Sequence, residues 1–574
     1  MAINSESVNS ARGTVSVLRR LVSPFRAYRI LKEITLFHRF QGSPGLVDAA
    51  RRMEELILEL GPDIVETELI EYTNRAGPEW LPLPAAWSVE SAVLIVGDRE
   101  YRLEAHPTLA VAHAPPSDGW VEGEVVAARD PLDPSSYSEK DKIYLVTEHH
   151  TIAYRIAAEQ GVAAIIMAKS SARPDAFPAI DLFLTPREIS KYSTPALTAP
   201  WREASQLEGK NIRMKVDATL GEHARLPVVA AWIGDRNDPG PLVMGHLCHP
   251  APGANDNASG AASSVEAFIA LAEAIDEGRL NHLEGRTVRL LLMPEWTGTV
   301  LSMEGWLGSL ATAGVNLDMV GAGNWARVAP PRILYPPLTA PKHRLADTMI
   351  LVASLAELDM GLRYYMFGSD HDILMAYGRE SVMVNQWPDP QYHSDLDDAD
   401  KIDPSRLAVA SIIGAASVYL YGAGAEPPVS WARRVVEDLV LDRLREGDEV
   451  GARLAGYYAA MRYGVEPITG LPEDWRPPAK EGELRLRDGK RLVLTVEPAT
   501  RGDLDAAIRL ARLLSERDDA AGIVRGETIF AALRKMPVGG FLTLVAAAYG
   551  VEASQWVADR LGELVELGVV EVSG

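Results

Sequence analysis

The sequence is poor in cysteine, in long apolar runs and in basic residues, and each shortage excludes a class of protein. One cysteine in 574 residues cannot form an intramolecular disulfide framework. No run of about 18 apolar residues occurs, so we expect no membrane-spanning segment and no membrane partner. Arginines interrupt residues 1–29 before an apolar signal region forms, so we predict no signal peptide and a cytoplasmic location.

Acidic residues outnumber basic ones, 79 to 57, which gives a net charge of −22. Such a charge repels phosphate backbones and anionic membrane surfaces, so we expect no nucleic-acid partner. The apolar share of 47% and the charged share of 24% are ordinary for a soluble globular protein. At about 150 residues per domain, the length suggests roughly four domains.

Changes in sequence pattern divide the chain into four parts. Residues 1–80 contain two segments with helical periodicity and then a strand pattern. Residues 81–220 contain short strand-like runs between turns, which predicts a small α+β domain inserted into a larger one. Residues 221–425 alternate between strand and helix patterns, with one predicted helix over 303–314. That alternation predicts an α/β fold with a mostly parallel or mixed sheet covered by helices.

The fourth part, residues 426–574, is predicted to be largely helical, and its end has the order helix, helix, helix, strand that is typical of a winged helix. Acidic residues outnumber basic ones between 527 and 574, so the charge that attracts DNA phosphates is missing. We therefore expect this end to serve packing or dimerisation, and the protein to be a homo-oligomer.

The stretch 244–264 reads MGHLCHPAPGANDNASGAASS and is the chemically richest part of the chain. An apolar run ends there in His246, and a loop rich in Gly, Pro, Asn and Asp carries Cys248, His249 and Asp256. Imidazole and carboxylate groups suit Zn²⁺, and a carboxylate has two oxygens that can bridge a pair of ions. We therefore predict that this loop belongs to the metal centre of a hydrolase.

Glu295 and Asp318 also lie at or just after apolar strand runs. Ligands of parallel sheets bind beyond the carboxyl ends of the strands, so we expect these acids near His246. Each residue has a simpler alternative: His246 would be a core histidine, Asp256 or Asp318 a turn former, and Glu295 a solvent-facing acid. Their occurrence together favours metal chemistry.

Six segments, taken in order, resemble one family. They match the co-catalytic zinc aminopeptidases of metallopeptidase family 28, which include bacterial leucyl aminopeptidase and aminopeptidase Y. The segments are FHRFQGSPGLVDAARRMEELILEL, GHLCHPAPGANDNASGAASSVE, MPEWTGTVLSMEGW, VNLDMVGAG, GSDHDIL and YHSDLDD. The resemblance covers residues 26–72 and 227–421, which makes 1–80 and 221–425 two parts of one peptidase domain. The insert resembles a protease-associated domain, and HLCHP with a winged helix resembles one branch of the family.

The resemblance implies a role for each matching position. His246 and Asp318 would hold one zinc ion, Asp256 would bridge to a second, and His393 would bind that second ion. Glu295 would be the general base. The resemblance also implies a cis peptide bond after Asp256.

Three positions depart from the family pattern. Trp296 stands where a second glutamate usually binds the second ion, Cys248 replaces a usual aspartate, and His249 is an extra imidazole. Either His249 or Asp370 compensates for Trp296, or the enzyme uses a single zinc ion. The cofactor expected is therefore zinc, as one or two ions.

The function that these residues predict is a metal-dependent aminopeptidase acting on peptides. Asp370 and His371 are candidates for binding the substrate's amino group, against the alternative of a local turn. Trp296, Trp325 and Trp387 are candidates for an apolar pocket, against ordinary packing. Two alternatives stay open: a single-zinc amide hydrolase or aminoacyl cyclase on the same fold, and a peptide-binding protein that has lost catalysis.

Overall fold

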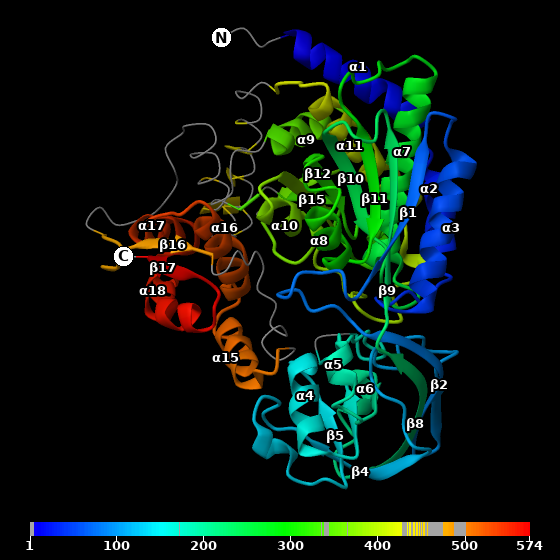
Figure 1. The fold of residues 1–574 in the computed structure, drawn as a ribbon, viewed down its shortest axis with the longest axis vertical. Helices are drawn as coiled ribbons and strands as arrows, with labels where there is room; N and C mark the ends of the chain where they lie inside the picture. The colour runs from blue at the N-terminus through cyan, green and yellow to red at the C-terminus, as the bar shows by residue number, and fades with distance from the viewer. Residues whose placement is uncertain are drawn as a thin grey trace.

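The computed structural model describes residues 5–170, 173–334, 336–337, 344–363, 365–427, 475–486 and 501–573, with a few more between 433 and 456. Most of the helical pattern predicted after residue 426 lies outside these described residues. Figure 1 shows three bodies: a large helix-covered sheet, an insert, and a group of C-terminal helices.

The main sheet has eight strands and is mixed. Its four central neighbours, β11, β10, β12 and β15, are parallel, whereas the pairs β1–β9, β9–β11 and β13–β15 are antiparallel. This is the predicted fold class. In spatial order the strands are β1 (Glu66–Thr73), β9 (Arg225–Ile233), β11 (Val288–Met293), β10 (Gly240–His246), β12 (Ala311–Leu317), β15 (Glu380–Asn385), β13 (Arg332–Leu334) and β14 (Gly361–Arg363).

Helices cover both faces of this sheet because successive strand side chains point to opposite sides. Val243 packs into one apolar core, whereas its neighbours Leu242 and Met244 pack into the other. The second core contains α8 (Thr297–Glu304) and α10 (Asp370–Ala376). The first contains α1 (Ser5–Leu21), α2 (Pro24–Ile34), α3 (Pro44–Leu60), α7 (Gly260–Asp276), α9 (Arg344–Leu355) and α11 (Pro404–Gly422).

Two helical segments are long and apolar enough to cross a membrane, Ala254–Asp276 and Pro404–Gly422. Their apolar windows are 94% and 83% buried inside the protein. Both segments contact β10, so they serve as core helices of the main sheet.

The predicted helix over 303–314 is wrong. Helix α8 ends at Glu304, and residues Ala311–Leu317 form strand β12 between β10 and β15. Small residues suit this strand because helix α10 approaches it closely: a Cβ added to Gly314 would lie 2.6 Å from Leu374 Cδ2. Alanine is also common in helices, so the composition of this strand does not distinguish it from a helix.

The insert, defined here as residues 86–221, has its own sheet of seven strands. Strands β4 to β7 are parallel, and helix α4 (His150–Gln160) packs on β5 and β6. In spatial order the strands are β3 (Arg99–Arg102), β2 (Ala86–Val96), β8 (Asn211–Gly221), β4 (Val121–Ala127), β5 (Ile143–Val146), β6 (Ala164–Met167) and β7 (Ala196–Thr198), with short helices α5 (Pro186–Ile189) and α6 (Trp201–Ala204).

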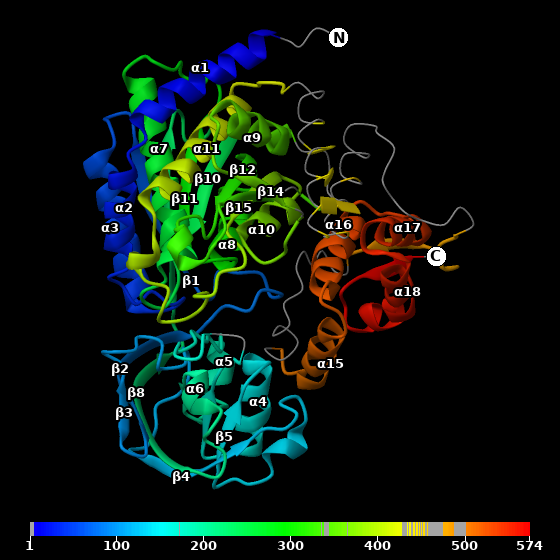
Figure 2. The same ribbon diagram turned by 180° about the vertical axis from the view of Figure 1, so that it is seen from behind.

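The C-terminal helices contact both other bodies, as the view from behind also shows (Figure 2). Helix α15 packs against α4 of the insert, and α16 packs against α10 beside the main sheet. Within this body the strands β16 (Glu483–Arg485) and β17 (Glu571–Ser573) pair antiparallel. Its helices are α15 (Leu504–Ser515), η6 (Gly522–Glu527), α16 (Thr528–Leu533), α17 (Val538–Tyr549) and α18 (Val551–Glu566).

Candidate metal centre

The predicted metal ligands meet at the carboxyl edge of the main sheet, where parallel α/β sheets bind ligands. His246 is the last residue of β10, and Asp318 follows the end of β12 directly. Asp256 lies in the helical turn η2 (Ala254–Ser259) that leads into α7, and its peptide bond to Asn257 is cis, as expected. His393 comes from the loop after β15.

These residues form two groups of three that share Asp256. In the first, His246 Nε2 lies 3.3 Å from Asp256 Oδ1 and 3.6 Å from Asp318 Oδ1. In the second, Asp256 Oδ2 lies 3.4 Å from His249 Nε2 and 3.1 Å from His393 Nε2. Within each triad the nearest donor atoms lie within 4.8 Å of one another, so each group has the size of a metal site. The two oxygens of Asp256 therefore face two separate positions.

The donor atoms are left free for an ion. His246 Nδ1 is 3.1 Å from the Cys248 carbonyl oxygen, and His249 Nδ1 is 2.8 Å from that of Pro250. Because a carbonyl only accepts, each Nδ1 carries a proton, and in the neutral imidazole the lone pair is on Nε2, the atom that faces Asp256. His249 Nε2 and Asp318 Oδ1 are buried and have no hydrogen-bond partner among the described residues. Buried polar atoms without partners are costly, and a bound cation would satisfy both.

Two residues that the motifs did not single out hold this loop in shape. The buried Arg39 guanidinium donates to the carbonyls of Leu247 at 2.7 Å and Gly253 at 2.7 Å. Asp397 accepts hydrogen bonds from the backbone N–H groups of Asn255 and Asp256, at 2.7 and 2.9 Å. Both lie in segments of the family resemblance, but their contacts are to backbone, which sequence patterns do not reveal.

The three departures from the family pattern have defined places. Cys248 is in neither triad; its sulfur accepts the backbone N–H of Glu295 at 3.1 Å, and burial raises the pKa of the thiol. Trp296 adopts φ +64° and its ring meets Phe367 edge-on at 5.2 Å. The second triad contains His249 in addition to Asp256 and His393, and Asp370 belongs to neither triad in the described part of the chain.

Electrostatics in this cluster are dominated by its acids. Burial raises the pKa of Glu295 well above its usual value, and Asp318, Asp370 and Asp256 add to the rise. Burial alone would lower the pKa of His246, yet Glu295 and Asp318 raise it well above its usual value. Carboxylates crowded in this way favour the binding of positive charge.

Asp370 and His371 lie beside the centre and outside both triads. Asp370 is buried and accepts the Trp296 N–H at 2.8 Å through Oδ1, and its Oδ2 has no hydrogen-bond partner among the residues that the structure describes. His371 Nε2 lies 3.1 Å from the Met366 carbonyl oxygen and 3.4 Å from Asp372. Neither side chain lines the three cavities described next, so their role in substrate binding stays a prediction.

Glu295 lines three cavities that open around it. The methionine cavity, of about 210 Å³, is walled by Met319, Met366, Phe367, Met383 and Trp387 and borders both triads. The insert cavity, of about 190 Å³, is lined by Phe40, Gln41, Cys248, His249, Pro250, His393 and insert residues 179–181 and Phe183. The Leu81 cavity, of about 240 Å³, is lined by Leu81, Pro82, Phe183 and Trp296, together with Gln41 and Thr297.

Of the candidate aromatic residues, Trp387 and Trp296 line cavities at the centre. Trp325 is 61% exposed and donates its indole N–H to the Asp400 carbonyl at 3.0 Å. The aromatic prediction therefore applies to two of the three residues.

The insert is attached to the loop that carries His393. The Ala179 N–H donates to the His393 carbonyl at 2.7 Å, and the Phe177 N–H donates to the Asp395 carboxylate at 2.9 Å. The other oxygen of Asp395 lies 2.9 Å from His106 Nδ1. The insert thus holds the loop of one predicted ligand and lines two cavities, the insert cavity and, through Phe183, the Leu81 cavity.

His38 makes the metal loop sensitive to acid. Its Nδ1 accepts the Ala251 N–H at 3.2 Å, its Nε2 is buried without a partner, and burial lowers its pKa to about 4. Below about pH 6.5 the unfolded chain binds a proton at His38 that the folded chain does not bind. The free energy of unfolding therefore falls as the pH drops towards 4. We expect a loss of at most about 3 kcal/mol over this window in the metal-free protein.

The variant His38→Asn isolates this contribution because the amide oxygen still accepts the Ala251 N–H but does not titrate. Urea unfolding of the metal-free variant should depend less steeply on pH between about 6.5 and 4 than that of the parent chain. Identical slopes for the two proteins would exclude His38 as the source.

Comparisons with known proteins agree with this fold. A search of the curated proteins finds no match. Among solved structures, the chain is similar to a peptidase M28 precursor from Shewanella amazonensis SB2B (17% identity, TM-score 0.54, covering 72% of this chain and 97% of that one). It is also similar to BSAP, a zinc aminopeptidase from Bacillus subtilis (16% identity, TM-score 0.52, 70% and 95% covered). At these identities the two likenesses concern the fold.

A family model provides the sequence evidence. Residues 227–417 match the model of peptidase family M28, and this range includes His246, Asp256, Asp318 and His393. The chain therefore carries a peptidase family M28 domain over residues 227–417.

Proposed function

We propose that the protein is a two-zinc aminopeptidase that removes amino-terminal residues from peptides. The observation that supports it is the pair of triads that share Asp256, one completed by His246 and Asp318 and the other by His249 and His393. Imidazole nitrogens and carboxylate oxygens are ordinary zinc ligands. When bound, two such ions would polarise the scissile carbonyl and acidify a water molecule.

The protein's own residues would provide the rest of the chemistry. Glu295 borders both triads, and burial raises its pKa well above its usual value, so its carboxylate would accept and hold the proton of the attacking water. The same carboxyl group would then deliver that proton to the leaving amine. The Cys248 sulfur and Gln41 hold the Glu295 backbone, through its N–H at 3.1 Å and its carbonyl at 2.9 Å.

The cavities suggest how a peptide would lie. The methionine cavity borders both triads and has one wall of methionine and aromatic side chains, so that wall would take the side chain of the first residue and favour leucine, methionine or phenylalanine. The insert cavity and the Leu81 cavity lie on other sides of Glu295 and would receive the departing part of the peptide. The cytoplasmic location and the homo-oligomeric state remain predictions.

The decisive experiment is an elemental count on the purified protein, combined with a panel of aminoacyl-nitroanilides with and without a chelator. We expect about two zinc ions per chain and hydrolysis of apolar aminoacyl-nitroanilides that a chelator abolishes. A count near one, without release of amino acids from peptides, would instead favour a single-zinc amide hydrolase or aminoacyl cyclase. Bound peptide without turnover would indicate a binding protein.

His249 distinguishes a two-ion site from a one-ion site. In His249→Ala the second triad is left with Asp256 and His393, so we expect zinc content to fall from about two ions per chain to about one, with a large loss of turnover. Elemental analysis after dialysis measures this. His223→Ala is the control, because His223 is exposed and outside both triads; it should keep the parent count. An unchanged count in His249→Ala would refute the assignment.

A further inference from the structure

One wall of the methionine cavity separates it from a second cavity. Met366 and Phe367 line the methionine cavity on one side. On the other side they line a cavity of about 690 Å³ that is shared with Arg517, Tyr549 and other residues of the C-terminal helices. Without support, the Phe367 ring therefore has room to move away from the metal centre.

The support comes from the C-terminal helices. The Arg525 guanidinium of η6 lies over the Phe367 ring, 5.6 Å from its centre, while Trp296 meets the same ring edge-on. The Arg525 side chain has no hydrogen bond or ion pair within the described part of the chain, and its Nε is buried without a partner there. Burial lowers the pKa of Arg525 to about 10, so it is still a cation at neutral pH. A mostly buried arginine without an acid partner is costly, and its ring contact is the interaction that remains to it.

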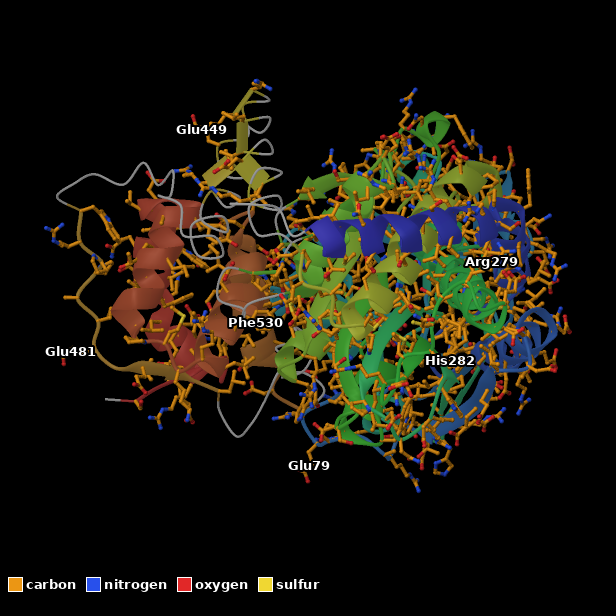
Figure 3. The ribbon with its side chains drawn as sticks, turned by 90° about the horizontal axis from the view of Figure 1, so that it is seen from above. Glu79, Arg279, His282, Glu449, Glu481 and Phe530 are labelled. Atoms are coloured by element: carbon orange, nitrogen blue, oxygen red, sulfur yellow. The ribbon has the colours of Figure 1, made fainter. Side chains whose placement is uncertain are left out.

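A second contact holds the start of the same segment. The Tyr365 hydroxyl donates to Asp372 Oδ1 at 2.7 Å, and Asp372 Oδ2 accepts the Gly368 N–H at 2.8 Å. Phe530 of α16 meets the Tyr365 ring edge-on at 6.4 Å, and Figure 3 shows Phe530 where the C-terminal helices face the main sheet. Gly526 leaves room for this packing: a Cβ there would lie 2.3 Å from Tyr365 Cε1.

We propose that the C-terminal helices determine which first residue the enzyme accepts, because Arg525 fixes the Phe367 wall of the methionine cavity. Arg525 is thus a positioning residue that acts through Phe367, and the inference rests on the proposed function of that cavity. The C-terminal helices are suited to this role because they are anchored twice, through α15 on α4 of the insert and through α16 on α10.

The test compares first residues of different size. Arg525→Met keeps an unbranched apolar side chain but removes the cation, so the ring loses its electrostatic hold. We expect KM for leucyl-nitroanilide to rise about fivefold, with kcat and the kinetics of alanyl-nitroanilide nearly unchanged. Arg525→Lys should restore most of the leucine preference. Gly526→Ala should also change the leucine-to-alanine ratio of kcat/KM, because it displaces Tyr365.

A matched control and a binding measurement complete the design. Arg560→Met removes an arginine of the same body that pairs with Glu516 at 3.0 Å and lies outside the wall; its leucine-to-alanine ratio should equal that of the parent chain. Calorimetric titration with the products leucine and alanine measures the same preference without turnover, so it tests the wall even if the peptidase proposal fails. An unchanged leucine-to-alanine ratio in Arg525→Met would overturn the inference, as would an equal loss for both substrates that merely follows lower thermal stability.

Discussion

Replacing Glu295 by glutamine should lower kcat/KM for leucyl-nitroanilide by a factor of about 10² to 10⁴, the usual contribution of a general base. The amide keeps the size of the carboxyl group and cannot take up a proton from water. Glu295 belongs to neither triad, so the zinc count of Glu295→Gln should stay at about two. Steady-state kinetics and elemental analysis of the same preparation measure the two quantities together.

The control for this change is Glu304→Gln, which makes the same substitution on the exposed end of α8. It should leave both kcat and zinc content unchanged. If Glu295→Gln retained turnover within a factor of a few, a base other than Glu295 would be required, and the catalytic proposal would fail while the metal proposal stood.

Asp256→Asn should lower turnover at least as much as Glu295→Gln does. It should also weaken zinc binding at both metal positions. Each oxygen of Asp256 faces a different triad, and an amide offers only one weakly binding oxygen in place of two charged ones. We therefore expect zinc to fall well below one ion per chain and turnover to fall below that of Glu295→Gln. Zinc analysis after dialysis, together with nitroanilide turnover, checks both expectations.

Asp389→Asn is a matched control for that variant. Asp389 is also a buried acid near the loop; it accepts the Asn255 side-chain N–H at 2.7 Å but belongs to neither triad. Its variant should keep about two zinc ions. Retention of both ions in Asp256→Asn would show that Asp256 does not bridge them.

The sequence supports prediction of the ligands better than prediction of their surroundings. His246, Asp256 and Asp318 follow buried strands, and the carboxyl edge of a parallel sheet brings such residues together whatever the loops do. His249 was one of two candidates to replace the missing glutamate, because spacing alone does not show which way an imidazole points. In the structure His249 lies within a triad, whereas Asp370 accepts the Trp296 N–H; that His249 binds the ion stays a prediction.

Other features depend on contacts between distant segments, and local patterns do not encode those. Residues 311–314 of strand β12 are predicted as the end of a helix because small residues, which here allow the close approach of α10, are also compatible with a helix. The methionine cavity combines residues from separate loops, and its outer support comes from Arg525, about 160 residues after Phe367. No spacing rule connects such positions.

The hydrogen bond between the Ala179 N–H and the His393 carbonyl bears on which substrates would reach the metal centre. A hinge-like opening of the insert, which would admit a bulky folded chain, would pull on the segment that carries a zinc ligand and loosen the ion. The insert would then be unable to open widely while the metal ion is bound. Under the proposed function, slender and unfolded peptides would avoid that conflict, so this hydrogen bond would favour them over folded chains as long as the metal is bound.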